Sequence, residues 1–123
     1  MGAPTLTPPI LPVNDGSVYA PRVAARFVLE FQVTPGREDD VRQAYAALRE
    51  RLQQGVPGLL GHQLCQNADD PLRFIITSEW EDLEASTSWD RSEEHNELVA
   101  PLRQCFERAG STKYVVQDGL PGR

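Results

Sequence analysis

The stretch that most constrains the fold is residues 69–80, which has the pattern of a turn followed by one long strand. Asp69, Asp70 and Pro71 are turn residues, because aspartates accept hydrogen bonds from their own backbone and proline fixes φ. The side chains that follow alternate between two faces, and both faces carry large or β-branched residues. A strand that is apolar on both faces is covered on both sides. We therefore expect helices on one face of its sheet and a second subunit on the other.

Apolar periodicity predicts further elements before and after this strand. Strands are expected at residues 25–33, 59–66 and 111–117, and helices at 38–54 and 92–109, with a short helical run that begins at 83 and is interrupted near 89–92. Asp82 and Ser92 are the expected N-caps of the last two helices. In the last helix, Leu98, Leu102, Cys105 and Phe106 form the expected apolar stripe, Pro101 is expected to kink it and Gly110 to end it.

The order strand, helix, strand, strand, helices, strand is the ferredoxin-like βαββαβ plan. It predicts an α+β domain at residues 23–118, with a four-stranded antiparallel sheet and helices on one face. Residues 119–123 form a short tail. Residues 1–22 hold five of the ten prolines and little charge, which favours an extended arm. We expect this arm to pack across its own domain or across a partner subunit.

The charge and the apolar content exclude several classes of protein. A formal net charge of -6 argues against nucleic acid and anionic membranes as main partners. No run approaches the roughly 18 apolar residues of a membrane span, and no signal-peptide pattern is visible. The two cysteines have no zinc or redox spacing, and the two histidines, His62 and His95, stand in no metal motif. We expect a cytoplasmic protein without a metal site.

Four short motifs follow one another at a distinctive spacing. They are Val33–Gly36, Val56–His62, Asp69–Phe74 and Glu79–Ala85. Together they resemble the antibiotic biosynthesis monooxygenase family over residues 24–117. The resemblance implies a dimeric α+β barrel, in which each subunit of a homodimer holds its own cavity between sheet and helices.

The resemblance also implies a cofactor-independent monooxygenase of secondary metabolism, whose substrates are dioxygen and a small anthrone- or quinol-like aromatic polyketide intermediate. A deprotonated polycyclic phenol can itself reduce dioxygen, so the protein need only bind the rings, stabilise the anion and orient oxygen. A non-oxidising polyketide cyclase or an accessory binding protein is the main alternative. Haem degradation is a weaker alternative, because Val99 replaces the histidine ligand of that subgroup and Leu29 lies at or near the position of its asparagine.

Residue by residue, the resemblance makes Trp80 a tryptophan of the cavity wall and His95 the candidate general base. An imidazole pKa near neutrality suits that role. Ile76 and Ser86 stand where the best-studied oxygenase pattern has an asparagine and a tyrosine, so two hydrogen-bonding groups are lost. The candidate substrate contacts are Trp89, Ile76, Ser78, Ser86, His62, Arg91 and Phe74.

Structural roles remain open for the same residues. Trp80 is also compatible with a core anchor, His62 with a half-buried structural histidine, and His95 with a surface histidine on an acidic helix. Arg73 and Arg91 are candidates for pairing with a substrate anion, although exposed arginines usually do not. The deciding feature is whether a titratable group reaches the cavity, because an oxygenase of this kind needs a base.

Overall fold

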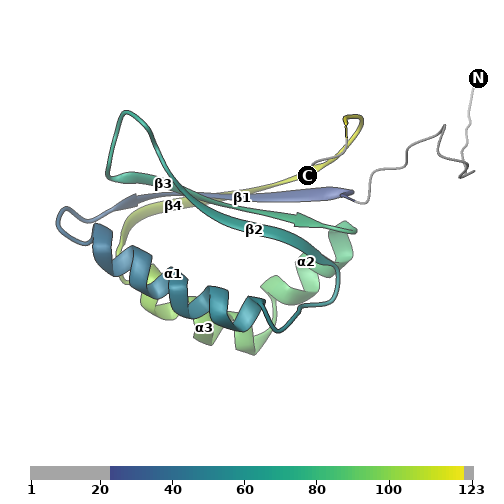
Figure 1. The fold of residues 1–123 in the computed structure, drawn as a ribbon, viewed down its shortest axis with the longest axis horizontal. Helices are drawn as coiled ribbons and strands as arrows, with labels where there is room; N and C mark the ends of the chain where they lie inside the picture. Colours follow the sequence, from purple (N-terminus) through teal and green to yellow (C-terminus); the bar gives the residue numbers. More distant parts are fainter. Residues whose placement is uncertain (1–22, 121–123) are drawn as a thin grey trace, which may run out of the picture.

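Residues 23–120, the part of the chain that this computed structural model describes, form one antiparallel sheet covered by helices on one face (Figure 1). The elements are β1 (Ala25–Val33), α1 (Glu38–Leu52), β2 (Leu59–Gln66), β3 (Arg73–Trp80), α2 (Leu83–Asp90), α3 (Glu93–Arg103) and β4 (Phe106–Val115). The strand order is β2-β3-β1-β4, with β1 and β3 in the centre. This confirms the predicted ferredoxin-like plan.

The two central strands, β1 and β3, contribute large apolar side chains to the core on the helix side of the sheet. Phe31 lies opposite Phe74, and Leu29 opposite Ile76, in the β1–β3 ladder. Directly opposed residues of antiparallel strands share a face, so these four side chains all point toward the helices. The intervening residues, such as Glu30, point to the open face of the sheet.

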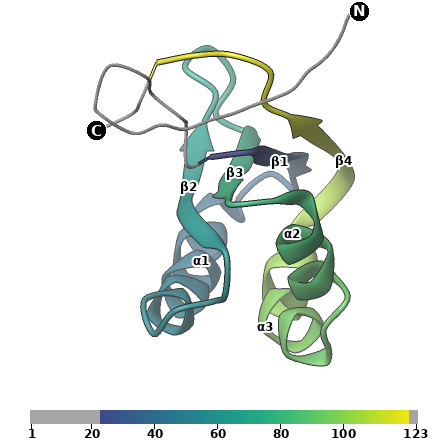
Figure 2. The ribbon, with the colours of Figure 1, turned by 90° about the vertical axis from the view of Figure 1, so that its right-hand side faces the viewer.

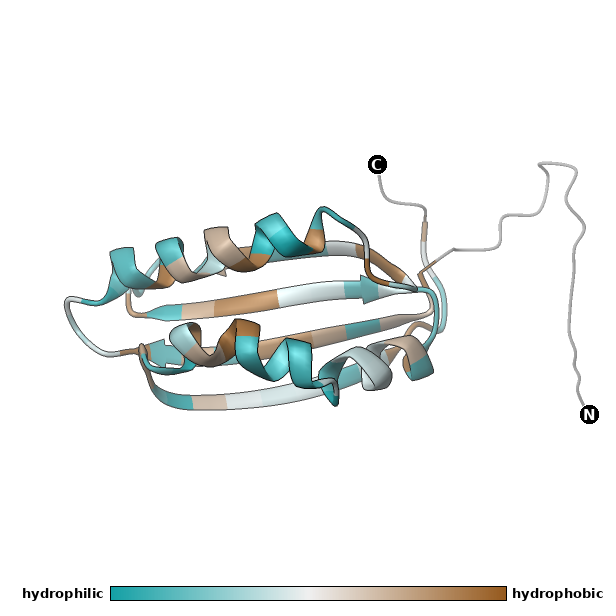
Figure 3. Ribbon diagram, turned by 90° about the horizontal axis from the view of Figure 1, so that it is seen from below, coloured by the Kyte–Doolittle hydropathy of each residue, from teal (hydrophilic) through white to brown (hydrophobic). Residues whose placement is uncertain are grey.

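The helices lie in two columns under the sheet. In Figure 2, α1 lies beneath the β2 side, and α2 and α3 lie beneath the β4 side. Figure 3 views the same layer from the helix side and shows apolar and polar segments alternating along α1 and α3. Val41, Tyr45, Leu48 and Leu52 are the buried stripe of α1, as the helical spacing predicts.

The predicted turn and both predicted caps are confirmed. The Asp70 carboxylate accepts a hydrogen bond from the Leu72 amide at 3.1 Å. Asp82 caps α2 by accepting from the Ala85 amide at 2.7 Å, and the Ser92 hydroxyl accepts from the His95 amide at 3.1 Å. The last cap fixes where the first turn of α3 begins, and therefore where His95 lies.

The prediction for the last helix is wrong at its C-terminal end. α3 ends at Arg103, within one turn of Pro101, and β4 begins at Phe106. Phe106 belongs to the sheet, where its ring stacks on Phe31 at a centroid distance of 4.1 Å. Gly110 does not end a helix but lies in β4 opposite Glu30. Pairing with β1 therefore overrides the local helical spacing of this segment.

The predicted arm, residues 1–22, and the last three residues of the tail lie outside the described residues. The expected packing of the arm therefore remains a prediction. Within residues 23–120, no helix is long and apolar enough to span a bilayer.

Candidate functional site

A cavity of about 380 Å³ lies between the sheet and the helices. Its sheet side includes Phe27 and Leu29 of β1, His62 of β2 and Ile76 of β3; its helix side includes Leu48 of α1, Trp89 of α2, and His95, Val99 and Leu102 of α3. The lining is mostly apolar, with a few polar groups. A volume of this size and such a wall are typical of sites for small, mainly apolar molecules.

His62 reaches the cavity from β2, opposite Ser78 of β3. Its Nδ1 lies 2.8 Å from the hydroxyl oxygen of Tyr45, and the two rings are stacked at a centroid distance of 5.6 Å. Burial, with a smaller contribution from His95, lowers the pKa of His62 to about 4. The ring is therefore neutral at pH 7, because burial disfavours its charged form.

His95 reaches the cavity from the first turn of α3. Burial lowers its pKa, Asp90 opposes that shift and Arg103 adds to it. Its Nδ1 is buried and has no hydrogen-bond partner among the described residues. A buried polar atom left without a partner costs free energy, and because Nδ1 is sealed from solvent it is not the atom of His95 that a ligand in the cavity would meet.

Trp89 closes the cavity beside His95. The two rings meet edge to face at a centroid distance of 5.6 Å. The guanidinium of Arg51 lies over the indole of Trp89, 5.6 Å from the ring centroid. Arg51 also forms an ion pair with Glu94 of α3. The cation–π contact and the ion pair together hold the end of α1 against the start of α3.

The structure brings four of the predicted site residues to the cavity: His95, His62, Trp89 and Ile76. Trp80 and Ser78 are buried beside it but do not line it, and the indole Nε1 donates to the Ser78 hydroxyl at 2.8 Å. The expectation that these two residues face the substrate therefore has no support in the geometry. An indole nitrogen that is satisfied by its own strand acts as a core anchor.

The remaining candidates also lie outside the cavity lining. Ser86 is buried on α2, and Phe74 is buried and stacks on Phe31 at 5.8 Å. Arg91 is exposed after the end of α2. Arg73 lies on the open face of the sheet, 3.4 Å from the Asp70 carboxylate, so it is not placed to pair with an anion in the cavity.

Tyr45 is the site residue that the sequence reasoning missed. Its helical spacing makes it one residue of the apolar stripe of α1, where it is 8% exposed. A signal was nevertheless present, since a tyrosine inside an apolar stripe needs a partner for its hydroxyl group. That requirement could have directed attention to the half-buried histidine of the neighbouring strand.

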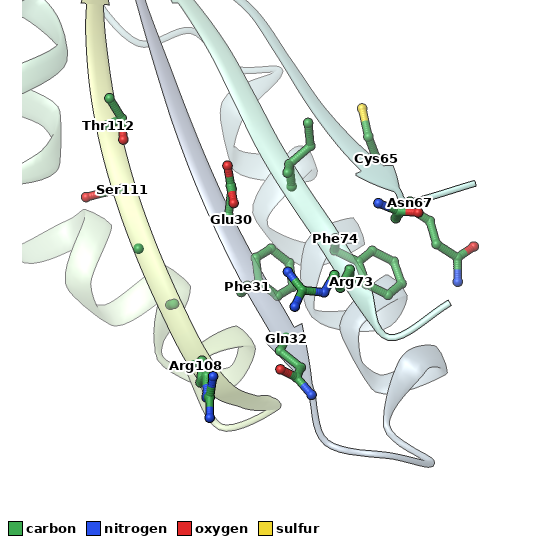
Figure 4. A pocket seen from close by; sticks show the side chains of 14 residues that line it. Glu30, Phe31, Gln32, Cys65, Asn67, Arg73, Phe74, Arg108, Ser111 and Thr112 are labelled. Carbon is green, nitrogen blue, oxygen red and sulfur yellow. The ribbon is translucent and has the colours of Figure 1, made fainter. Parts of the chain in front are cut away.

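A second hollow, of about 580 Å³, lies on the opposite face of the sheet (Figure 4). Its charged groups are Glu30, Arg73 and Arg108, which come from three neighbouring strands and are exposed. It is open sheet surface rather than an enclosed apolar chamber. Among residues 23–120, no three His, Cys, Asp or Glu side chains come close enough together to hold a metal ion.

Comparison with known proteins places this architecture among related sequences. Protein SchA of Streptomyces halstedii is 37% identical over 106 residues, which is 86% of this chain and 26% of that protein. The 42.8 kDa protein in the whiE locus of Streptomyces coelicolor is 36% identical over 91 residues, covering 74% of this chain and 23% of that protein. The chain thus spans about a quarter of the length of these curated relatives.

Solved structures share the fold at lower identity. A protein from Methanosarcina mazei has a TM-score of 0.70 at 21% identity, covering 78% of this chain and 95% of that one. SnoaB, a cofactor-independent oxygenase from Streptomyces nogalater, has a TM-score of 0.68 at 18% identity, covering 80% and 97%. The family model described as antibiotic biosynthesis monooxygenase matches residues 25–101, which is more than half of the sequence. The chain belongs to the antibiotic biosynthesis monooxygenase family.

Proposed function

We propose that the cavity binds an anthrone- or quinol-like aromatic polyketide intermediate and that the protein oxidises it with dioxygen to a quinone. The observation that carries this proposal is the pair of neutral imidazoles, His62 and His95, in the wall of an otherwise mainly apolar cavity. A planar ring system fits such a wall, and a neutral imidazole can accept a proton at pH 7.

His95 is the proposed base. It removes a proton from the reacting carbon or hydroxyl group of the substrate, and the resulting anion passes electrons to dioxygen. Trp89 and the apolar side chains of β1 hold the rings in place. For an anthrone, the overall reaction consumes one dioxygen, places one of its oxygen atoms in the new carbonyl group and releases the other as water with both hydrogens of the reacting carbon. The substrate supplies the electrons.

The open face of the sheet is the proposed contact with a second copy of the chain. Val28 and Ile75 are half-buried apolar residues at its centre, although no helix of the described chain covers them. Glu30 and Arg108 lie near them, and opposite charges on one face can pair with the same face of another copy. A homodimer of this kind leaves one cavity in each subunit.

A second candidate function is a polyketide cyclase or accessory binding protein of the same fold. Ile76 favours it, because this residue presents a hydrocarbon side chain to the cavity where a polar one would help to bind an anion. Such a protein would bind the same rings without consuming oxygen.

Oxygen uptake separates the two functions. The purified protein is mixed with a panel of anthrones and naphthols, and quinone formation is followed by absorbance. Uptake without added flavin, haem or metal is the expected result. Saturable quenching of tryptophan fluorescence by the same compounds, without uptake, would replace the oxygenase proposal with the binding or cyclase role.

A further inference from the structure

We infer that Tyr45 is a positioning residue that holds His62 as its Nε2–H tautomer, and that this N–H group donates a hydrogen bond to the substrate oxygen on which negative charge develops. The inference deepens the proposed function and rests on it. It divides the chemistry between the two histidines: His95 accepts the proton, and His62 stabilises the anion that remains.

The first step of the argument is the direction of the hydrogen bond between Tyr45 and His62. The hydroxyl oxygen and Nδ1 are 2.8 Å apart, and Tyr45 is almost fully buried. Burial also raises the pKa of Tyr45, so its hydroxyl group keeps its hydrogen at pH 7. His62 Nδ1 is the one acceptor that the described residues offer to this hydrogen.

The opposite arrangement is costly. If Nδ1 carried the hydrogen and donated to the tyrosine oxygen, the phenolic hydrogen would have no acceptor among residues 23–120. A donor that is largely withdrawn from water and has no acceptor is costly. Nδ1 of His62 is therefore the acceptor, and in a neutral ring the hydrogen must then be on Nε2.

The second step is that His62 Nε2 is free. Within residues 23–120 it has no hydrogen-bond partner, and it is not among the polar atoms that are sealed from solvent. Since the ring lines the cavity and its other nitrogen is bound to Tyr45, Nε2 is the polar atom that His62 offers to a molecule inside.

The third step is chemical. Removing a proton from an anthrone moves negative charge onto its carbonyl oxygen. A fixed N–H donor in a mainly apolar cavity stabilises such an oxyanion more strongly than water does, because the donor is already oriented. A neutral donor suits this role, since its charge does not change during the reaction. The cavity wall also holds Asp90 and Arg103, so the test must leave these charges and His95 unaltered.

The tautomer can be read directly from ¹⁵N-labelled protein by long-range ¹H–¹⁵N NMR at pH 7. We expect a protonated Nε2 and an unprotonated Nδ1 for His62. Tyr45→Phe removes only the hydroxyl group, and it should mix the two tautomers without changing the fold, which circular dichroism checks. Tyr114→Phe is the matched control, because Tyr114 is exposed on β4. A wild-type His62 protonated on Nδ1 would overturn the inference.

The oxyanion role is measured with 4-nitro-1-naphthol, an acidic naphthol whose anion absorbs visible light and whose binding needs no oxidation. We expect the wild-type protein to prefer the anion over the neutral form. His62→Leu should lower the affinity for the anion by roughly ten- to a hundredfold, and Tyr45→Phe by about three- to tenfold, the range for a hydrogen bond to a charged group. His62→Gln should keep part of the affinity for the anion, because the glutamine amide can donate a hydrogen bond to the same oxygen.

The outcomes separate this inference from the proposed function. A protein that binds the naphthol but has the same preference for the anion after Tyr45→Phe and His62→Leu contradicts the oxyanion role, even if oxygen uptake is observed. A protein that shows the expected tautomer and anion preference but consumes no oxygen supports the oxyanion site and contradicts the oxygenase proposal. A protein that binds no naphthol at all contradicts both.

Discussion

The two faces of the sheet are built from alternate residues of the same strands, yet they have different chemistry. On the helix face, Leu29 and Ile76 line a mainly apolar cavity into which two neutral imidazoles reach. On the open face, the neighbouring residues Glu30 and Ile75 lie in a surface of mixed charged and apolar groups. One step along a strand therefore separates a position in the proposed ligand site from a position at the proposed subunit contact.

The two faces also differ in the hydrogen-bond and ion-pair partners of their polar side chains. On the open face, charged side chains pair near solvent, as Arg26 does with Glu79 at 2.7 Å. On the helix face, Tyr45 satisfies one nitrogen of His62, and Nδ1 of His95 has no partner in the described chain. The enclosed face therefore holds a few polar groups within a mainly apolar wall, where the substrate is proposed to bind, whereas the open face carries the apolar side chains at which the second copy is proposed to bind.

The helix face is tested most strongly by His95→Ala. We expect the turnover rate with an anthrone to fall by roughly 10²–10⁴-fold, because the substitution removes the proposed general base. Glu97→Ala, an exposed change on the same helix, is the control and should leave the rate unaltered. Steady-state oxygen uptake measures both variants. An unchanged rate in His95→Ala would remove this histidine from the mechanism.

A pH titration of stability tests the burial of His62. The folded-state pKa of about 4 lies below the ordinary value of 6.5. Between these two pH values His62 is protonated in the unfolded chain but neutral in the folded chain. The free energy of unfolding therefore falls as the pH is lowered from about 6.5 to 4. The resulting decrease in the free energy of unfolding is on the order of 3 kcal/mol.

The measurement is urea unfolding at pH 7 and at pH 4 for the wild type and for His62→Gln. The carboxylates contribute equally to both proteins, so the variant should show the smaller loss of stability with acid. Equal pH dependence in the two proteins would mean that His62 is not shielded from water in the folded state.

The open face is tested by Ile75→Asp. A carboxylate at the centre of a subunit contact must lose its hydration, so we expect the dissociation constant of the proposed dimer to rise at least about tenfold. Ala47→Asp adds the same charge to the exposed side of α1 and is the control. Sedimentation equilibrium reports both. A wild-type monomer, or a dimer that tolerates Ile75→Asp, would place any subunit contact elsewhere.

The sequence predicted the fold well where local chemistry and tertiary pairing agree. Asp82 and Ser92 are capping residues by type, and the structure uses them as caps. The failure at Phe106 has a physical cause. Its helical spacing from Leu102 is a local signal, whereas its pairing with β1 and its stacking on Phe31 depend on residues far away in the sequence.

The candidate site was predictable only in part for a related reason. Strand parity indicated a half-buried His62, whereas His95 was a candidate base only through the family resemblance, and its acidic helix was equally compatible with a surface position. No spacing rule could connect Tyr45 with His62, because their contact forms between α1 and β2. Parity alone also could not show that Ser78 takes the indole hydrogen bond of Trp80 and so keeps this residue out of the cavity.

The smallest expected effect concerns Trp80→Phe. The change removes the indole N–H group and leaves the buried Ser78 hydroxyl without its donor, so we expect a loss of about 1–2 kcal/mol in the free energy of unfolding. Turnover should stay within about twofold of wild type, since Trp80 does not line the cavity. The matched variant is Trp89→Phe, which alters a ring of the cavity wall and should weaken substrate binding more than it weakens the fold. Urea unfolding and the Michaelis constant are measured for both. If Trp80→Phe impairs turnover more than Trp89→Phe does, the buried layer beneath the cavity, and not its wall, determines how the substrate is held.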